Sequence, residues 1–231
     1  MFKVNVISLF PDMIDNTMKY SIPGRALKEN LWQLNSVQMR DFSDDKFSRV
    51  DDMPYGGGAG MLIKPEVIDN SLTSLGESAG KIIYMSPKGK PLTQEVAVDL
   101  SSQEKITIIC GRYEGIDQRV IDKWSMDEIS IGDYVLSGGE IAACALLDSV
   151  VRLLPNVLGA EESLDDESFT NGLLEYPHYT RPAVWNDMEV PEILRSGNHK
   201  AINDWRVKQS EEITKSRRLD LWKKYVKVNN N

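Results

Sequence analysis

Residues 108–117 read IICGRYEGID, and residues 129–140 read ISIGDYVLSGGE. Each segment begins as an apolar run, typical of a buried strand, and continues into glycines. A strand that ends in glycine lets backbone amides and carbonyls approach a ligand, because no Cβ stands in the way. Two such strand ends, about twenty residues apart, predict one pocket lined by main chain and suited to a nucleoside-like cofactor. A third glycine-rich turn, YGGGAGM at residues 55–61, points the same way.

Apolar runs and helix signals alternate over the first half of the chain. Strands are expected at 4–10, 34–39, 81–85 and 105–110, and helices from Pro11, over 93–100 and over 116–124. This alternation predicts an α/β fold with a parallel sheet. Ligands of such sheets bind beyond the carboxyl ends of the strands, where all three glycine-rich turns can be placed. The polar segment 41–61 is expected to form a long functional loop.

The second half of the chain changes character along its length. Residues 139–154 are apolar on most faces, so we expect a largely buried helix that packs on the sheet or against a second subunit and that stops before Pro155. Residues 160–171 are acidic and resemble a linker, and residues 176–182 are rich in aromatic residues and proline. Ser196-Gly197-Asn198 then signals the start of a basic amphipathic helix.

Composition narrows the class of protein. The 231 residues suffice for one large domain or a domain plus an appendage. The two cysteines, Cys110 and Cys144, lie in apolar runs and are interpreted as buried small hydrophobes, which with only two histidines argues against a zinc site. The first residues show no signal-peptide pattern, and the longest apolar run, Ile141 to Leu147, is too short to span a bilayer. We therefore expect a cytoplasmic protein without a membrane partner.

Charge is divided unevenly along the chain. From Arg195 onward ten Lys and Arg face four Asp and Glu, which gives this tail a net charge of +6. The whole chain carries −8, so the remainder carries −14. A basic tail on an acidic body favours nucleic-acid binding by the tail, because affinity for phosphates comes from Lys and Arg. A solvated helix face explains the tail's charge equally well.

Five collinear motifs resemble one family. They are PYGGGAGM at 54–61, CGRYEGID at 110–117, SIGDYVLSGGE at 130–140, LLEYPHYTRP at 173–182 and SGNH at 196–199. Together they resemble bacterial tRNA (guanine-N1)-methyltransferases over residues 2 to about 222. The resemblance implies methyl transfer from S-adenosylmethionine to N1 of the guanosine just 3′ of the anticodon, position 37 of tRNA.

The same resemblance implies an architecture that the patterning does not. Its fold is the SPOUT type, an α/β parallel sheet with a deep trefoil knot, followed by a small C-terminal helical domain. It implies a knotted cofactor domain at residues 1–160, a linker at 161–172 and a helical tRNA-binding domain at 173–231. It also implies an obligate homodimer with the cofactor pocket at the subunit interface.

The resemblance carries a set of cofactor-binding residues onto this chain. They are Tyr84, Met85, Ser86, Pro87, Gly111, Glu114, Ile131, Gly132, Asp133, Tyr134, Val135, Leu136, Gly138 and Gly139. Without the resemblance, tight turns alone are the favoured interpretation of the glycines in this set. Ala142 stands where relatives often have proline, a departure that concerns the rigidity of the pocket more than its function.

Catalysis at guanine N1 needs a base for the N1 proton and a cation or donor facing O6, where negative charge builds. Arg152 matches the family's catalytic arginine, although a helix-end arginine that complements the dipole is the plainer interpretation of this residue alone. The family's base is Asp before Ser-Phe, and here the register gives Glu167. Asp166 is the alternative base. In the non-catalytic interpretation, this segment is only a solvated acidic linker. The family is associated with Mg²⁺, for which no sequence motif marks a site.

Contacts to tRNA are expected from the second half of the chain. His178, Tyr179 and Arg181 lie in the family's substrate-binding patch, where aromatic rings and Arg planes can stack on an extruded base. Lys208 and Arg217, together with Lys215 and Arg218, are expected to contact the tRNA backbone. Glu114 is a candidate for orienting the cofactor or the base, and Asp51, Asp52 and Arg112 are candidates for indirect or substrate contacts. There are two rival hypotheses. One is an RNA-binding module that has lost its catalytic base, and the other is a related enzyme that acts on another RNA.

Overall fold

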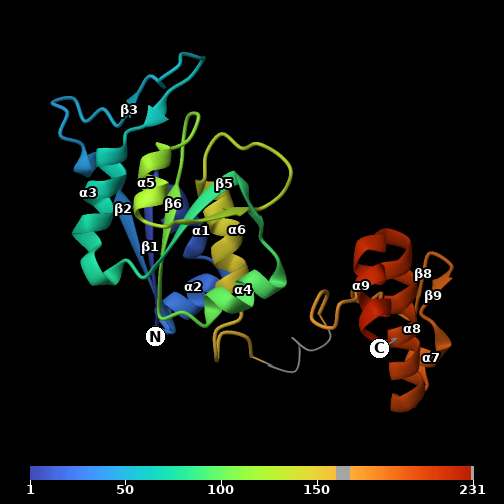
Figure 1. Ribbon diagram of the computed structural model, residues 1–231. Helices are drawn as coiled ribbons and strands as arrows, with labels where there is room; N and C mark the ends of the chain where they lie inside the picture. Colours follow the sequence, from blue (N-terminus) through green and yellow to red (C-terminus); the bar gives the residue numbers. More distant parts are fainter. Residues whose placement is uncertain (160–166, 230–231) are drawn as a thin grey trace. The chain divides into compact units, whose positions relative to one another are not determined.

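A computed structural model describes residues 1–159 and 167–229 (Figure 1). The chain divides into two compact units, Met1–Gly159 and Ala160–Asn231. The linker predicted at 161–172 lies partly outside the described residues, and residues 167–172 form turns. No helix in the described ranges is long and apolar enough to cross a membrane.

The first unit is built on a parallel sheet, five strands wide within the described residues, in the order β2-β1-β6-β5-β7. These strands are β1 (Phe2–Ser8), β2 (Trp32–Gln38), β5 (Lys81–Pro91), β6 (Lys105–Cys110) and β7 (Asp127–Ser130). The central strands β1 and β6 are buried almost throughout, as strands covered on both faces must be. The predicted α/β parallel sheet is therefore confirmed.

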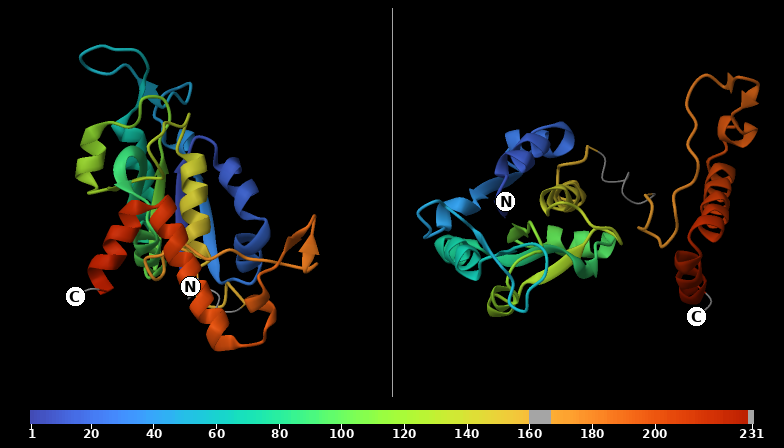
Figure 2. Two further views of the ribbon diagram at one scale, coloured as in Figure 1. Left: turned by 90° about the vertical axis from the view of Figure 1, so that its right-hand side faces the viewer. Right: turned by 90° about the horizontal axis from the view of Figure 1, so that it is seen from above.

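Two hydrophobic cores lie on opposite faces of this sheet. Alternate residues of β5 divide between them, with Ile83 and Met85 in one core and Ile82 and Tyr84 in the other. The first core is covered by α1 (Pro11–Met18), α2 (Ser21–Lys28), α4 (Gln94–Ser101) and α6 (Glu140–Val151), and the second by α3 (Pro65–Leu75) and α5 (Gln118–Lys123). Figure 2 shows α1 and α6 on one side of the sheet and α3 on the other.

Helix α6 packs almost entirely within its own unit. Eight of its twelve residues are buried, and its contacts are with α1, α4 and the sheet. Only Ile141 among its large apolar side chains is exposed, by 54%. Of the two interpretations of this helix, packing on the sheet is the one observed for its buried residues. Cys110 and Cys144 are free and buried in the same core, as predicted.

Strand β5 is longer than the sequence predicts and is interrupted. Met85 and Lys90 both pair with Ile129 of β7, so residues 86–89 bulge out of the sheet between them. Gly89 lies so close to β7 that a Cβ would stand 2.4 Å from the Ile129 nitrogen. Pro87, Gly89 and Pro91 are turn signals in the sequence, and pairing with β7 overrides them.

The segment 39–63 is mostly irregular, as expected for the predicted loop. It holds a 3-10 turn, η1 (Met39–Phe42), and a small antiparallel sheet of β3 (Asp51–Asp52) and β4 (Leu62–Ile63). A second 3-10 turn, η2 (Gly76–Ser78), follows α3. The YGGGAGM turn lies between β3 and β4, not after a strand of the main sheet as the sequence suggested.

In the part of the second unit that the structure describes, residues 167–229, a hairpin is followed by three helices. The hairpin pairs β8 (Val184–Trp185) with β9 (Met188–Glu189). The helices are α7 (Glu192–Arg195), α8 (His199–Arg217) and α9 (Leu219–Asn229). Asn198 caps α8 by accepting the Ala201 N–H at 3.2 Å, where the sequence places the start signal. The basic tail is thus two packed helices.

Candidate active site

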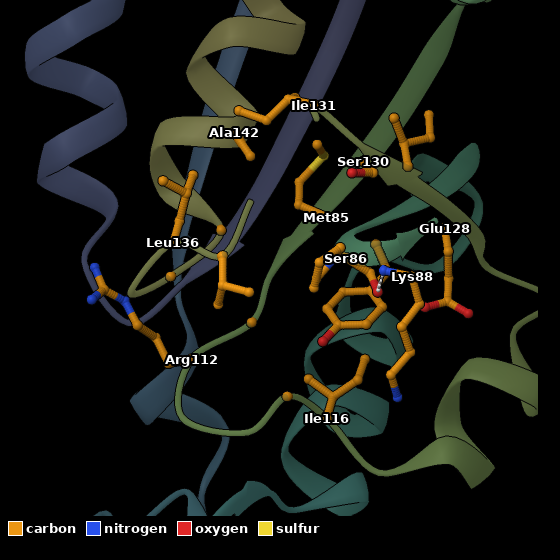
Figure 3. A pocket seen from close by; sticks show the side chains of 18 of the residues that line it. Met85, Ser86, Lys88, Arg112, Ile116, Glu128, Ser130, Ile131, Leu136 and Ala142 are labelled. Atoms are coloured by element: carbon orange, nitrogen blue, oxygen red, sulfur yellow. Dashed lines mark hydrogen bonds between the residues drawn. The ribbon is translucent and has the colours of Figure 1, made fainter. Parts of the chain in front are cut away.

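A pocket of about 320 Å³ opens at the carboxyl ends of β5, β6 and β7 (Figure 3). Its lining comes from the bulge after Met85, the 111–118 loop, the end of β7, the 131–139 loop and Ala142 of α6. The volume is at the lower end of the range for small-molecule sites. The two glycine-rich segments that the sequence singles out therefore form walls of one pocket.

Every predicted cofactor-binding residue except Asp133 lines this pocket. The Tyr134 N–H donates to the Gly132 carbonyl oxygen at 2.9 Å, which closes a three-residue turn with Asp133 at its tip. Gly132 has φ of 153°, which lets the chain enter this turn. The Asp133 side chain is therefore exposed beside the pocket, and the assignment of this residue to cofactor binding stays a prediction.

The two loops touch through glycines that have no room for a side chain. The Gly139 N–H donates to the Gly111 carbonyl oxygen at 2.9 Å, and Arg112 and Gly138 form an antiparallel bridge. A Cβ on Gly139 would stand 2.9 Å from the Cys110 Cα, and a Cβ on Gly111 would stand 2.9 Å from the Tyr84 ring. Both distances are shorter than real Cβ contacts, so glycine at both positions permits the observed approach.

Tyr84 forms one wall of the pocket and is 7% exposed. Burial raises the pKa of its phenol above the ordinary value, and a hydrogen bond from the Ile116 backbone acts in the opposite direction. The phenol is therefore neutral at physiological pH. Its ring packs against Gly111 and its hydroxyl against Gly115, so Tyr84 supports the 111–116 loop from beneath.

Charged residues stand on two sides of the pocket. Lys88 and Glu128 lie on one side, and Arg112 lies on the opposite side with its guanidinium directed toward α1 (Figure 3). Arg112 Nε lies 3.0 Å from Oε2 of the buried Glu140, as an ion pair without hydrogen-bond alignment. From the sequence, Arg112 was a candidate site residue but its partner Glu140 was not, although each of them follows a predicted pocket glycine.

The YGGGAGM turn supports the pocket from outside. The Glu114 N–H donates to the Met61 carbonyl oxygen at 2.9 Å, and the Glu114 side chain packs against Gly60. Residues 55–60 do not contribute to the lining, contrary to expectation. Asp51 and Asp52, in β3, also lie outside it.

Arg152 stands apart from the pocket of its own chain. It caps the C-terminal end of α6, whereas Ala142 at the other end lines the pocket. They are ten positions apart, which is about 15 Å along the helix axis. A single copy of the first unit therefore does not bring the predicted catalytic arginine to the predicted cofactor pocket.

Glu167 begins a hydrogen-bonded turn in the second unit. The Phe169 N–H donates to the Leu173 carbonyl oxygen at 2.8 Å, and the Glu175 N–H donates to Ser168 Oγ at 3.0 Å. The Leu174 N–H donates to Thr214 Oγ1 of α8 at 2.8 Å, which fastens the turn to that helix. Asp165 and Asp166 lie outside the described residues.

The predicted substrate patch forms an aromatic and basic cluster in the second unit. His178 Nε2 lies 2.8 Å from Glu175 Oε1, and the Tyr176 and His178 ring centroids are 4.8 Å apart. The Tyr179 ring faces Trp205 of α8, 6.4 Å away. Arg181 is exposed, and Lys208 and Arg217 lie exposed on α8.

Arg206 adds a cation to this cluster that the sequence did not single out. Its guanidinium lies over the Tyr176 ring, 4.8 Å from the ring centroid. The neighbouring pair Trp205-Arg206 at the centre of α8 was the available signal.

The described residues hold no group of three or more His, Cys, Asp or Glu side chains that could bind a metal ion. They therefore show no side-chain cluster that would by itself hold the Mg²⁺ associated with the family.

Comparisons with known proteins agree with the resemblance. A family model described as tRNA (Guanine-1)-methyltransferase TrmD matches residues 2–224. A tRNA (guanine-N(1)-)-methyltransferase of Rhodospirillum rubrum is 52% identical over 96% of this chain and 92% of its own length. Proteins of the same name from Pelagibacter ubique and Brucella ovis are 48% and 51% identical over 98% of this chain. The chain therefore belongs to the tRNA (guanine-N1)-methyltransferase family.

Proposed function

We propose that this enzyme transfers a methyl group from S-adenosylmethionine to N1 of guanosine 37 in tRNA, beside the anticodon. The observation that carries the proposal is the pocket at the carboxyl ends of β5, β6 and β7, whose walls are glycine-rich loops. Backbone groups and small apolar side chains suit a flat adenine, and the volume admits a bent nucleoside. Bound there, S-adenosylmethionine supplies an electrophilic methyl group.

The pocket residues divide the binding task. Main-chain groups of residues 131–136 hold the adenine, and the segments around Ser86 and Gly111 hold the rest of the cofactor. Tyr84, neutral and buried, keeps the 111–116 loop in place. Support comes from the close backbone approach at Gly111 and Gly139, where side chains would fill the space.

Glu167 and Arg152 perform the proton and charge chemistry. The Glu167 carboxylate accepts the N1 proton of guanine, and the Arg152 guanidinium stabilises the negative charge that builds on O6. Guanine N1 is a weak acid, so the base succeeds only if Arg152 favours the deprotonated ring. The turn that begins at Glu167 is fastened to α8 by Thr214, which supports Glu167 as the positioned base.

Two copies of the chain are needed for this arrangement. Arg152 lies about 15 Å along α6 from the pocket, so a pocket from one copy and an arginine from another make a complete site. Apolar side chains that could form the interface are exposed around the start of α6, namely Phe10, Val135, Leu136 and Ile141. We propose a homodimer through this surface.

The trefoil knot of the family is proposed for the first unit. β7 lies at the sheet edge, yet α6 packs over α1 and α4. The chain between them passes the end of β6, where Gly139 bonds to Gly111. This return path is the part of the chain that a knot would use.

The second unit is proposed to hold the anticodon arm through its basic tail, from Arg195 onward. Lys208, Arg217 and their neighbours would contact phosphates, and Tyr179 or His178 would stack on an extruded base. The acidic body of the enzyme would then contribute little phosphate affinity of its own.

The test is methyl transfer from labelled S-adenosylmethionine to two tRNA transcripts, one with G and one with A at position 37. We expect incorporation into the G transcript only, mapped to N1, with loss of turnover in E167Q and retention in D166N. Loss in D166N alone would move the base to Asp166. Cofactor binding without any incorporation would instead favour a binding module or another RNA substrate.

A further inference from the structure

A buried carboxylate stands beside the pocket without lining it. Glu140 is the first residue of α6 and is 0% exposed. Ser8 Oγ, at the end of β1, donates to Glu140 Oε1 at 2.7 Å, and Arg112 Nε lies 3.0 Å from Oε2. A buried charge is tolerated only when paired, and the amino end of a helix favours a negative one.

Arg112 connects this carboxylate to both pocket loops. Its own backbone belongs to the loop after β6, and its Nη1 donates to the Ser137 carbonyl oxygen at 3.3 Å. A Cβ on Gly138 would stand only 2.3 Å from this Nε, so the Arg112 side chain packs directly against that glycine. The guanidinium also lies over the Phe10 ring, 4.6 Å from the centroid. The side chain therefore spans from one pocket wall to the next, and Figure 3 shows it directed away from the pocket.

We propose that Glu140, supported by Ser8, is a positioning residue that sets the spacing of the two pocket loops through Arg112. The proposal rests on the proposed function, that this pocket holds S-adenosylmethionine. Glu140 fixes Arg112 Nε, and Arg112 fixes Ser137 and Gly138 against its own loop. The loops are then already in the cofactor-binding arrangement before the cofactor arrives, which reduces the ordering that binding must accomplish.

The geometry favours this role over a contribution to stability alone. A buried ion pair is seldom more stabilising than apolar residues of similar volume, but it specifies one arrangement of the groups it joins. Here the joined groups are β1, the loop after β6 and the 134–139 loop, the last two of which are pocket walls. Neither glutamate oxygen faces the pocket, so Glu140 acts through Arg112.

The experiment measures binding of S-adenosylhomocysteine, a non-reactive probe, to the full-length enzyme by titration calorimetry without RNA. The variants are E140Q, which keeps the shape but removes the charge, and R112K, which keeps the charge but loses the planar fork. We expect each to weaken binding roughly tenfold, as loss of orienting partners does at other sites. A third variant, S8A, removes the hydroxyl that donates to Glu140 and should also weaken binding. Its matched control is S71A, because Ser71 is also buried but donates to the Ile68 carbonyl oxygen of its own helix.

Steady-state kinetics separate positioning from general damage. The KM for S-adenosylmethionine should rise in E140Q and R112K, while kcat at saturating cofactor and the KM for tRNA stay within about threefold of wild type. Unchanged probe affinity in folded E140Q and R112K would overturn this inference alone. A wild-type enzyme that does not bind the probe would overturn the proposed function as well. If E140Q does not fold, R112K carries the same test.

Discussion

Gly111 is a residue at which the pocket has no room for a side chain. A Cβ there would stand 2.9 Å from the Tyr84 ring, and the backbone angle itself would accept alanine. Overpacking of this kind costs about 1–3 kcal/mol, so G111A should weaken cofactor binding about tenfold or more while the enzyme stays folded. Titration calorimetry measures the effect. G159A is the control, because no atom lies within 4 Å of the Cβ it adds; equal affinities for the two variants would contradict the prediction.

Single residues also show what the sequence could reveal about the site. Gly111 and Gly132 were predictable because each stands just after an apolar strand, a pattern local to the chain. The position of the Asp133 side chain outside the lining was not predictable, because a three-residue turn directs it outward and no local signal marks that turn. The pairing of Arg112 with Glu140 was not predictable, because the residues are far apart in sequence and only the fold joins them.

At the scale of elements, α3 and α5 are joined by a polar clamp. The Asp69 carboxylate of α3 accepts from Lys123 Nζ at 2.6 Å and from Trp124 Nε1 at 2.8 Å. These two hydrogen bonds hold the pKa of Asp69 below its ordinary value of 3.8, and the one from Lys123 has the larger effect. The stabilisation is therefore fully present above that value and is lost as the pH falls through the lower folded-state pKa.

D69N should accordingly destabilise the enzyme at neutral pH, by no more than about 1 kcal/mol because Lys123 is largely exposed. The difference from wild type in the free energy of unfolding should shrink as the pH falls below 3.8. Urea unfolding of both proteins at neutral pH and at pH about 3 measures this difference. A difference that is the same at both pH values would show that the Asp69 charge is not the cause.

Elements differ in how far the sequence predicts them. β6 has the bounds predicted for it, because its apolar run is uninterrupted between polar neighbours. Helix α3 was not predicted, although Pro65 and the buried Val67, Ile68 and Leu72 carry a helical pattern. The extension of β5 past Pro87 could not be predicted, because only pairing with β7 makes it a strand.

At the scale of the whole molecule, the separation of Arg152 from the pocket predicts complementation between subunits. We expect R152A and G111V to be inactive alone. A purified heterodimer of the two should recover about half of the wild-type activity, because a two-fold dimer then keeps one intact site of two. Co-expression with two different affinity tags and tandem purification gives the heterodimer.

The control is a doubly tagged dimer in which both subunits carry R152A. A heterodimer no more active than this control would place Arg152 and the pocket of one chain in the same site, and the proposed arrangement would be wrong. The fold class was predictable at this scale from alternating elements, whereas a site shared between copies was expected only from the family resemblance.

The burial of both thiols has a practical consequence for labelling. Burial raises the pKa of Cys110 and of Cys144, and the thiolate is the form that reacts with maleimides and iodoacetamides. These are the only two cysteines of the chain. A third cysteine placed on the surface, for instance in place of the exposed Asp133 beside the pocket, would be the preferred target of a fluorophore. Cofactor entry could then be followed by fluorescence without first replacing either native thiol.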